Sequence, residues 1–210
     1  MTPEQNSTES LPAILPVFPL NALLFPRWQL PLVIFEPRYL NMLDDVMSSH
    51  HMIGMIQALG GDRSAPSLAK IGCLGRVDKF IESEDGRYHI VLTGLSRYKV
   101  AEEQNVQTPY RQVKADYSMF STDLKEPDGD DLPDRLRIEA ACDIYANHTI
   151  GPALPHIRAF DDSPYEVMIN ALIVSCPFRP IEKQALLEAA TLKARSEMLI
   201  KLLAMAGGNN

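Results

Sequence analysis

The side chains best suited to chemistry in this chain are two adjacent histidines and a cysteine in a strand-like segment. His50 and His51 could suggest a metal ion, but neighbouring side chains at a helix end point apart, and no third ligand follows at a useful spacing. Cys73 could suggest a nucleophile, but a reactive thiolate needs an activating base and an electropositive surrounding. It lies beside Gly72 in a predicted strand, where a small buried side chain is the expected role. We therefore predict a solvated helix end at the histidines and a packing role for Cys73.

Two acidic clusters raise the question of a cation site. Asp128, Asp130 and Asp131 lack the twelve-residue spacing and the closing glutamate of a calcium loop. Asp161-Asp162 is shorter still, and both clusters are interpreted as solvated charge. No G-x-x-x-x-G-K-[ST] phosphate loop occurs in the sequence. The sequence thus predicts no catalytic residue, no cofactor and no metal, and we expect the purified protein neither to hydrolyse nucleotides nor to cleave peptides.

Glu36, Arg38 and Tyr39 lie where a strand-like segment changes into a helical one. Pro37 suits the first position of a helix. The Glu36 carboxylate is predicted to accept hydrogen bonds from the exposed amides of the first turn, and to pair with Arg38 or Arg97. A structural role for these residues is favoured over a functional one, because the exposed amides at a strand-to-helix corner need hydrogen-bond acceptors. The helix itself is predicted from apolar residues at helical spacing, which are Tyr39, Met42, Leu43, Val46 and Met47.

Methionine is unusually frequent, with nine residues in the chain. Flexible thioethers such as those of Met42, Met47, Met52 and Met55 suit a groove that accepts varied apolar partners. Met42 and Met47, however, lie on the predicted core side of the helix. Core packing is therefore favoured over a peptide groove.

The bulk composition is that of an ordinary globular protein, with 46% hydrophobic and 22% charged residues. The net charge of -7 disfavours a nucleic-acid binder, which normally carries a basic face. No segment approaches the roughly 20 apolar residues of a membrane helix. Residues 1–10 are polar and are predicted to be a disordered leader rather than a signal peptide. Cys73, Cys142 and Cys176 are odd in number and far apart, which indicates reduced thiols and a cytoplasmic location.

Residues 11–117 are predicted to form a β-rich domain. Prolines break its first segment into short strands, since proline cannot donate to a central ladder. Asp85-Gly86 between two strand-like segments predicts a tight hairpin, and 60–66 is predicted to be a loop. Short strands with a turn about every ten residues are typical of a closed or partly closed barrel.

The acidic stretch 118–130 is predicted to be a linker, followed by a helical domain at 131–210. Leu136, Ala140 and Ile144 are expected on one helical face, beside Ala141 and Tyr145. Ser163-Pro164-Tyr165-Glu166 is expected to start a helix with a capping box. The last helix should dock through Leu199, Leu202 and Leu203, and Leu202→Asp should cost on the order of 3 kcal/mol.

Several of these segments resemble the amino-terminal, substrate-binding domain of Lon proteases. The motif Ile34-Phe35-Glu36-Pro37-Arg38-Tyr39 is similar to the opening of that domain. Three later segments are similar to its central strands in order and spacing, namely Ile71 to Val77, Asp85 to Tyr88 and Leu92 to Tyr98. Pro109-Tyr110, Glu182 to Glu188 and Arg195 are similar to later parts of it. The resemblance implies an α+β fold, in which an N-terminal β-rich pseudo-barrel of the PUA-like kind precedes a C-terminal helical bundle. The ATPase and peptidase modules of a complete Lon protease are not in this sequence, so we expect either a stand-alone member of the family or a fragment of a larger protein, and the stand-alone member is favoured.

The resemblance implies a non-enzymatic module that binds unfolded or exposed apolar polypeptide, with an ATP-dependent protease as a possible partner. Recognition would use an edge strand or a groove. Two alternatives stay open, an RNA-binding PUA-like module and an enzyme of unknown chemistry. No substrate-binding residue is assigned from the sequence.

Overall fold

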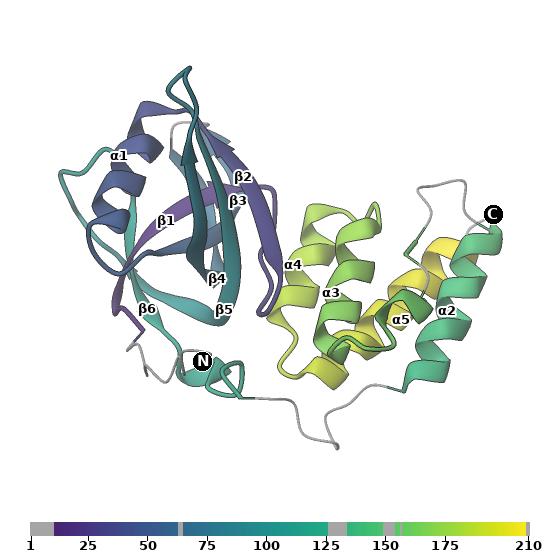
Figure 1. Ribbon diagram of the computed structural model, residues 1–210. Coiled ribbons are helices and arrows are strands. Elements are labelled where there is room, and N and C mark those ends of the chain that lie inside the picture. The colour runs from purple at the N-terminus through teal and green to yellow at the C-terminus, as the bar shows by residue number, and fades with distance from the viewer. Residues whose placement is uncertain (1–10, 63–64, 126–133, 149–153, 156, 209–210) are drawn as a thin grey trace.

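A barrel of strands is followed by a bundle of helices in the computed structural model, which describes residues 11–62, 65–125, 134–148, 154–155 and 157–208 (Figure 1). The strands are β1 (Ile14–Leu20), β2 (Gln29–Ile34), β3 (Met52–Asp62), β4 (Ala65–Glu82), β5 (Tyr88–Glu103) and β6 (Gln112–Asp116). The helices are α1 (Pro37–Met47), α2 (Arg135–His148), α3 (Tyr165–Ser175), α4 (Pro180–Glu188) and α5 (Leu192–Gly208), with short 3-10 turns η1 (Ser118–Phe120) and η3 (Ile157–Phe160). The predicted α+β fold is confirmed. Among the described helices none is both long and apolar enough to cross a membrane.

Five strands close into the barrel, and β2 is added at its margin. The sheet order is β2-β5-β4-β3-β1-β6, and a further pairing of β5 with β6 closes the ring. β1 and β3 are parallel, whereas the other pairs are antiparallel. The long β5 pairs with β2 near its beginning and with β6 near its end. Among the described strands β5 is therefore the one partner of β2, which leaves the other side of β2 unpaired.

Two turns of the barrel show how far the glycine pattern predicts local structure. Gly86 has a φ of +76° in the tight connection between β4 and β5, as the Asp-Gly pair predicted. The loop predicted at 60–66 is wrong in its extent, because β3 continues to Asp62 and β4 begins at Ala65. Gly60 and Gly61 lie in β3 with φ values of +102° and +97°, and the register shifts between Ala58 and Gly61. These glycines bend a strand rather than end it.

The hydrophobic core is continuous from the barrel into the helices. One cluster joins Phe18 and Phe25 of the barrel part to Tyr39 and Leu43 of α1 and to Leu203 of α5. A smaller cluster fills the other side of the barrel; its buried residues are Leu15, Val17, Met52, Ile56, Ala69, Leu74, Tyr98 and Val113. Met42, Met52 and Met55 are buried and Met47 packs against the core, so these thioethers fill the interior. The predicted core role of the methionines is confirmed.

The helical part packs differently from two of our sequence predictions. On α2 the exposed face carries Leu136 and Ile144, 76% and 45% exposed, whereas the buried side is formed by Ile138, Ala141 and Tyr145. Leu136, Ala140 and Ile144 share one face as predicted, but this face is the more exposed one, although Ile144 still lies beside Gly207 of α5. On α5, Leu199 and Leu203 are fully buried, whereas Leu202 is only partly buried.

The beginning of α3 lacks the predicted capping box. Its N-cap position is Pro164, with no side-chain hydrogen bond, and Ser163 lies one residue earlier. Glu166 is buried and pairs with two arginines instead. A buried charge partner competes with local capping for the same carboxylate, and here the partner prevails.

The first part of the predicted linker is packed into the molecule. Phe120 of η1 and Asp123 are buried against the barrel and the helices. Residues 1–10 and 126–133, where the leader and the acidic run Asp128 to Asp131 were predicted, lie outside the described residues. We propose that 11–117 and 131–210 are the two domains that the sequence predicted, with the segment around Asp123 bonded to both.

Candidate functional site

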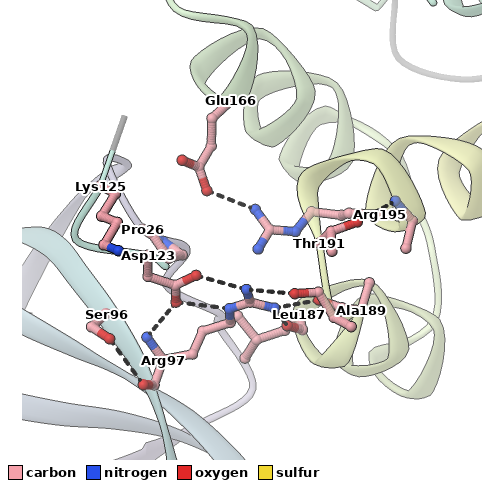
Figure 2. A network of polar contacts seen from close by, with 12 residues as sticks. Pro26, Ser96, Arg97, Asp123, Lys125, Glu166, Leu187, Ala189, Thr191 and Arg195 are labelled. Carbon is pink, nitrogen blue, oxygen red and sulfur yellow. Dashed lines mark hydrogen bonds and ion pairs between the residues drawn. The ribbon is translucent and has the colours of Figure 1, made fainter. Parts of the chain in front are cut away.

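A buried ion pair joins the barrel to the helices. Arg97 of β5 is 2% exposed, and its Nη2 lies 2.7 Å from Oδ1 of Asp123 while its Nε lies 2.9 Å from Oδ2 (Figure 2). The same guanidinium donates to the carbonyl oxygens of Leu187, at 3.0 Å, and Ala189 at the end of α4. The Cζ atom of the Arg97 guanidinium also lies 4.2 Å from the centre of the Phe120 ring. Of the two partners predicted for Glu36, Arg97 is thus excluded, because it pairs with Asp123 and holds the barrel to the helices.

A second charged cluster lies beside the first in Figure 2. Nη1 of Arg195 on α5 lies 3.0 Å from Oε1 of Glu166 (Figure 2). Arg27 donates to Oε2 of the same carboxylate at 2.5 Å. Arg195 also stacks over Phe25, 5.3 Å from the ring centre. Burial lowers the pKa of Arg195, and the charge of Arg97 acts in the same direction. Two such clusters fix the helices against the barrel, so binding surfaces are better sought elsewhere on the protein.

The strand-to-helix corner holds Glu36, Arg38 and Tyr39 at one pocket. Glu36 is the N-cap residue of α1, but its carboxylate makes no capping hydrogen bond, which corrects that prediction. It accepts from Arg38 Nη2 at 2.9 Å, so the predicted pair with Arg38 is confirmed. The Arg38 guanidinium lies 4.6 Å from the Tyr39 ring centre, and Tyr39 stacks on Phe18 at 4.3 Å. Stacking fixes the ring, and its hydroxyl makes no hydrogen bond to any residue that the structure describes.

The pocket at this corner has a volume of about 490 Å³. Its walls come from segments far apart in the sequence, which are the end of β1, the beginning of α1, the end of β3, the beginning of β4 and the residues before β6. Tyr110 and Arg111 line it from the last of these, and the Tyr110 hydroxyl donates to Asp45 Oδ2 at 2.5 Å. Arg111 pairs with Glu103 at 2.6 Å and donates to the carbonyl of Pro66 at 2.5 Å. The motif Pro109-Tyr110 marked this segment in the sequence, but it did not predict the contact of Tyr110 with α1.

The second surface feature is the outward face of β2 and its neighbours. The side chains of Val33 and Ile81 are 45% and 63% exposed on this face. Together with Pro31, His89 and Val91 they line a shallow depression of about 210 Å³. On the opposite face of β2, Ile34 is buried in the core. The alternation of inward and outward side chains predicts such a half-buried strand, but sequence alone does not say which strand lacks a second partner.

None of the described residues first considered for chemistry lines either of these two surfaces. His50 Nδ1 accepts the Met52 amide at 3.0 Å, burial lowers the His50 pKa, and His51 has a φ of +57° after α1. Cys73 is fully buried, and Asp161 pairs with Arg135 rather than with a cation. Among the described residues no group of three or more His, Cys, Asp or Glu side chains is close enough to hold a metal.

The thiols should be slow to react, which gives a direct test. Burial raises the pKa of Cys142 to about 11 and that of Cys176 to about 12, and it raises the pKa of Cys73 as well. Since the thiolate is the nucleophile, raised pKa values leave little reactive form at neutral pH. We expect iodoacetamide labelling of Cys142 in the folded protein to keep accelerating up to about pH 11, as followed by peptide mass spectrometry. The urea-unfolded chain is the control, and a folded-state midpoint near that of the unfolded chain would contradict this expectation.

Comparison with known proteins identifies relatives of the whole chain. The family model of the ATP-dependent protease La (LON) substrate-binding domain matches residues 14–205. Lon protease 2 of Myxococcus xanthus is 26% identical over 204 residues, and Lon protease 2 of Sorangium cellulosum is 28% identical over 212. These matches cover 93% and 96% of this chain but 24% and 25% of the relatives. The chain therefore spans about a quarter of the length of these curated relatives.

Solved structures show the same fold. A Lon N-terminal domain protein from Xanthomonas campestris has a TM-score of 0.65 and 21% identity, and the match covers 90% of this chain and 97% of that one. The N-terminal domain of the Mycobacterium avium complex Lon protease has a TM-score of 0.55 and 13% identity, with 91% and 98% covered. The family match over nearly the entire chain agrees with the resemblance of its motifs. The chain belongs to the Lon substrate-binding domain family.

Proposed function

We propose that this protein is a non-enzymatic module that binds extended apolar polypeptide, and that the outer edge of β2 is the binding site. The observation that carries the proposal is that β2 pairs with β5 on one side and with no other described strand. A strand edge offers unpaired backbone donors and acceptors, onto which an extended segment can add as a further strand.

The surface beside this edge suits an apolar partner. The depression of about 210 Å³ is lined mainly by Pro31, Leu32, Val33 and Val91, with Lys79 and His89 among the polar exceptions. A strand added at the edge would place alternate side chains on this face. Shallow apolar contacts tolerate many different partner sequences instead of selecting a single one. The affinity for any one polypeptide should therefore be modest, about micromolar or weaker.

The backbone of β2 gives a specific test. In an antiparallel ladder, successive residues direct their amides alternately toward the partner and away from it. The nitrogen of Pro31 should face away from β5, since it has no proton to donate, and Val33, two residues on, should face the same way. The Val33 amide would then be a donor for an added strand.

We therefore expect Val33→Pro to weaken binding of an unfolded polypeptide by about tenfold while the β5 pairing survives. The matched control is Val33→Thr, which keeps the amide and the β-branched shape and should change affinity much less. Fluorescence anisotropy with a labelled, carboxymethylated unfolded protein measures both, using the full chain. Equal binding by wild type and Val33→Pro would remove the β2 edge as the site.

The same titration separates the polypeptide hypothesis from the RNA alternative. Polypeptide binding should change little between low and high salt, because backbone pairing and apolar contact dominate it. RNA binding through phosphate contacts would weaken steeply with salt. Salt-sensitive binding of single-stranded RNA without polypeptide binding would favour the RNA alternative. The cytoplasmic location and a partner protease are proposed with this function, on the basis of the family.

A further inference from the structure

The pocket of about 490 Å³ at the beginning of α1 contains a hydroxyl group with nothing to bind. Tyr39 is 5% exposed and lines the pocket, and its hydroxyl makes no hydrogen bond to any described residue. Burial raises the pKa of this hydroxyl, so it stays protonated and is a donor at neutral pH. The hydroxyl oxygen itself is not fully enclosed by protein, so it faces the open pocket and is available to donate to a ligand there.

Two arginines and one glutamate lie near this donor. The charges of Arg38 and Arg111 both act on the Tyr39 hydroxyl and favour its anionic form, while Glu36 acts in the opposite direction. Arg111 uses three N–H groups, two toward Glu103 and one toward Pro66. A guanidinium has five N–H donors, so two of those of Arg111 are left for a further acceptor. The pocket therefore combines one hydroxyl donor with two guanidinium groups.

Most of the remaining lining is apolar, and Asn21 is its polar exception. Pro19, Leu20, Pro66 and Pro109 form walls, and Gly60 and Gly61 leave one side without side chains. A Cβ added at Gly60 would meet nothing within 4 Å. Such walls suit one or two apolar side chains attached to an anionic group. Glu36 opposes an anion, but its side chain is 47% exposed and already paired with Arg38.

We propose that this pocket holds the C-terminal carboxylate of a polypeptide, with the last apolar side chain against the proline walls. The carboxylate would accept from the Tyr39 hydroxyl and from Arg111. The proposal rests on the proposed function only in taking a polypeptide as ligand. The pocket and the depression beside β2 share no lining residue, so each site can be tested without the other.

The test compares a labelled hexapeptide ending in leucine as free acid with the same peptide as C-terminal amide. The acid should bind about tenfold more tightly, the effect of one charge-assisted contact. In the Tyr39→Phe protein, affinity for the acid should fall toward that for the amide, while the ring packing stays. Tyr110→Phe is the matched control, because it removes a hydroxyl from the same pocket that already has Asp45 as its partner.

A variant that is expected to bind more tightly shows that the loss of affinity in Tyr39→Phe is not simply due to misfolding. Glu36→Gln removes the opposing charge and should tighten binding of the acid several-fold without tightening the amide. Equal affinity for acid and amide, or acid selectivity unchanged in Tyr39→Phe, would overturn the proposal. Displacement of the peptide by acetyl-leucine at equal concentration would also overturn it, because the pocket would then serve a small acid. The result of the Val33→Pro experiment, whichever way it falls, does not affect these outcomes, because that substitution lies outside this pocket.

Discussion

Asp123→Ala is expected to lower the free energy of unfolding by about 3 to 5 kcal/mol, because it leaves the buried Arg97 guanidinium without its counter-ion. The Asp123 carboxylate accepts from both Nε and Nη2 of Arg97 and from the Arg97 backbone amide at 2.8 Å. Both side chains are almost inaccessible, 2% and 5% exposed, so water cannot replace the lost contacts. Urea denaturation followed by circular dichroism measures the change.

Two further variants separate a buried charge from a general loss of contacts. Removing both charges, by Arg97→Met with Asp123→Ala, should recover part of the loss, because no unpaired charge then remains. Asp78→Ala breaks the exposed pair with Arg76, 2.7 Å long, and should cost less than about 1 kcal/mol. A loss for Asp123→Ala as small as that for Asp78→Ala would show that the clamp contributes little.

Leu203→Asp is expected to cost on the order of 3 kcal/mol or more, since it places a carboxylate in the core of the helical part. Leu203 is 0% exposed, and it belongs to the cluster that also contains Leu199 and Leu172. The matched variant is Leu202→Asp, one residue earlier on the same helix. Leu202 is partly buried beside the pocket that Met205 and Phe178 line, so a carboxylate there can reach water.

We therefore expect the thermal midpoint of Leu203→Asp to fall well below that of Leu202→Asp, as measured by differential scanning calorimetry. This order corrects the sequence-based expectation, which assigned the large loss to Leu202. Equal midpoints would mean that the orientation of α5 differs from the one described.

Local signals in the sequence predicted most of the elements. Gly86 marks its hairpin because a tight turn needs positive φ, and Pro37 marks the beginning of α1 because a first-turn residue needs no amide donor. The two faces of α2 could not be told apart in this way. Leu136 and Ile138 are both apolar, yet Leu136 is 76% exposed and Ile138 is buried, and this difference depends on how α2 packs in the folded protein.

The charged contacts were hardest to predict, since their partners are distant in the chain. Arg97 and Asp123 are 26 residues apart, and Arg27 and Glu166 are 139 apart. Asp123 lies in an acidic, linker-like stretch, where composition indicates a solvated charge. The sequence did not predict that the Tyr39 hydroxyl lacks a hydrogen-bond partner, because this can be recognised only when the residues around the hydroxyl are known.

The continuous core has a consequence for protein engineering. Asn170 of α3 donates to the Pro26 carbonyl at 2.9 Å, Gln184 of α4 to that of Ile71 at 3.0 Å, and Gln57 to that of Pro180 at 3.1 Å. A fragment cut after residue 117 would expose the apolar surface under the helices and would remove Asp123, Leu187 and Ala189, the partners of the Arg97 guanidinium, so we expect it to aggregate. A fusion that carries this fold should therefore include barrel and bundle together, with the joint placed beyond α5.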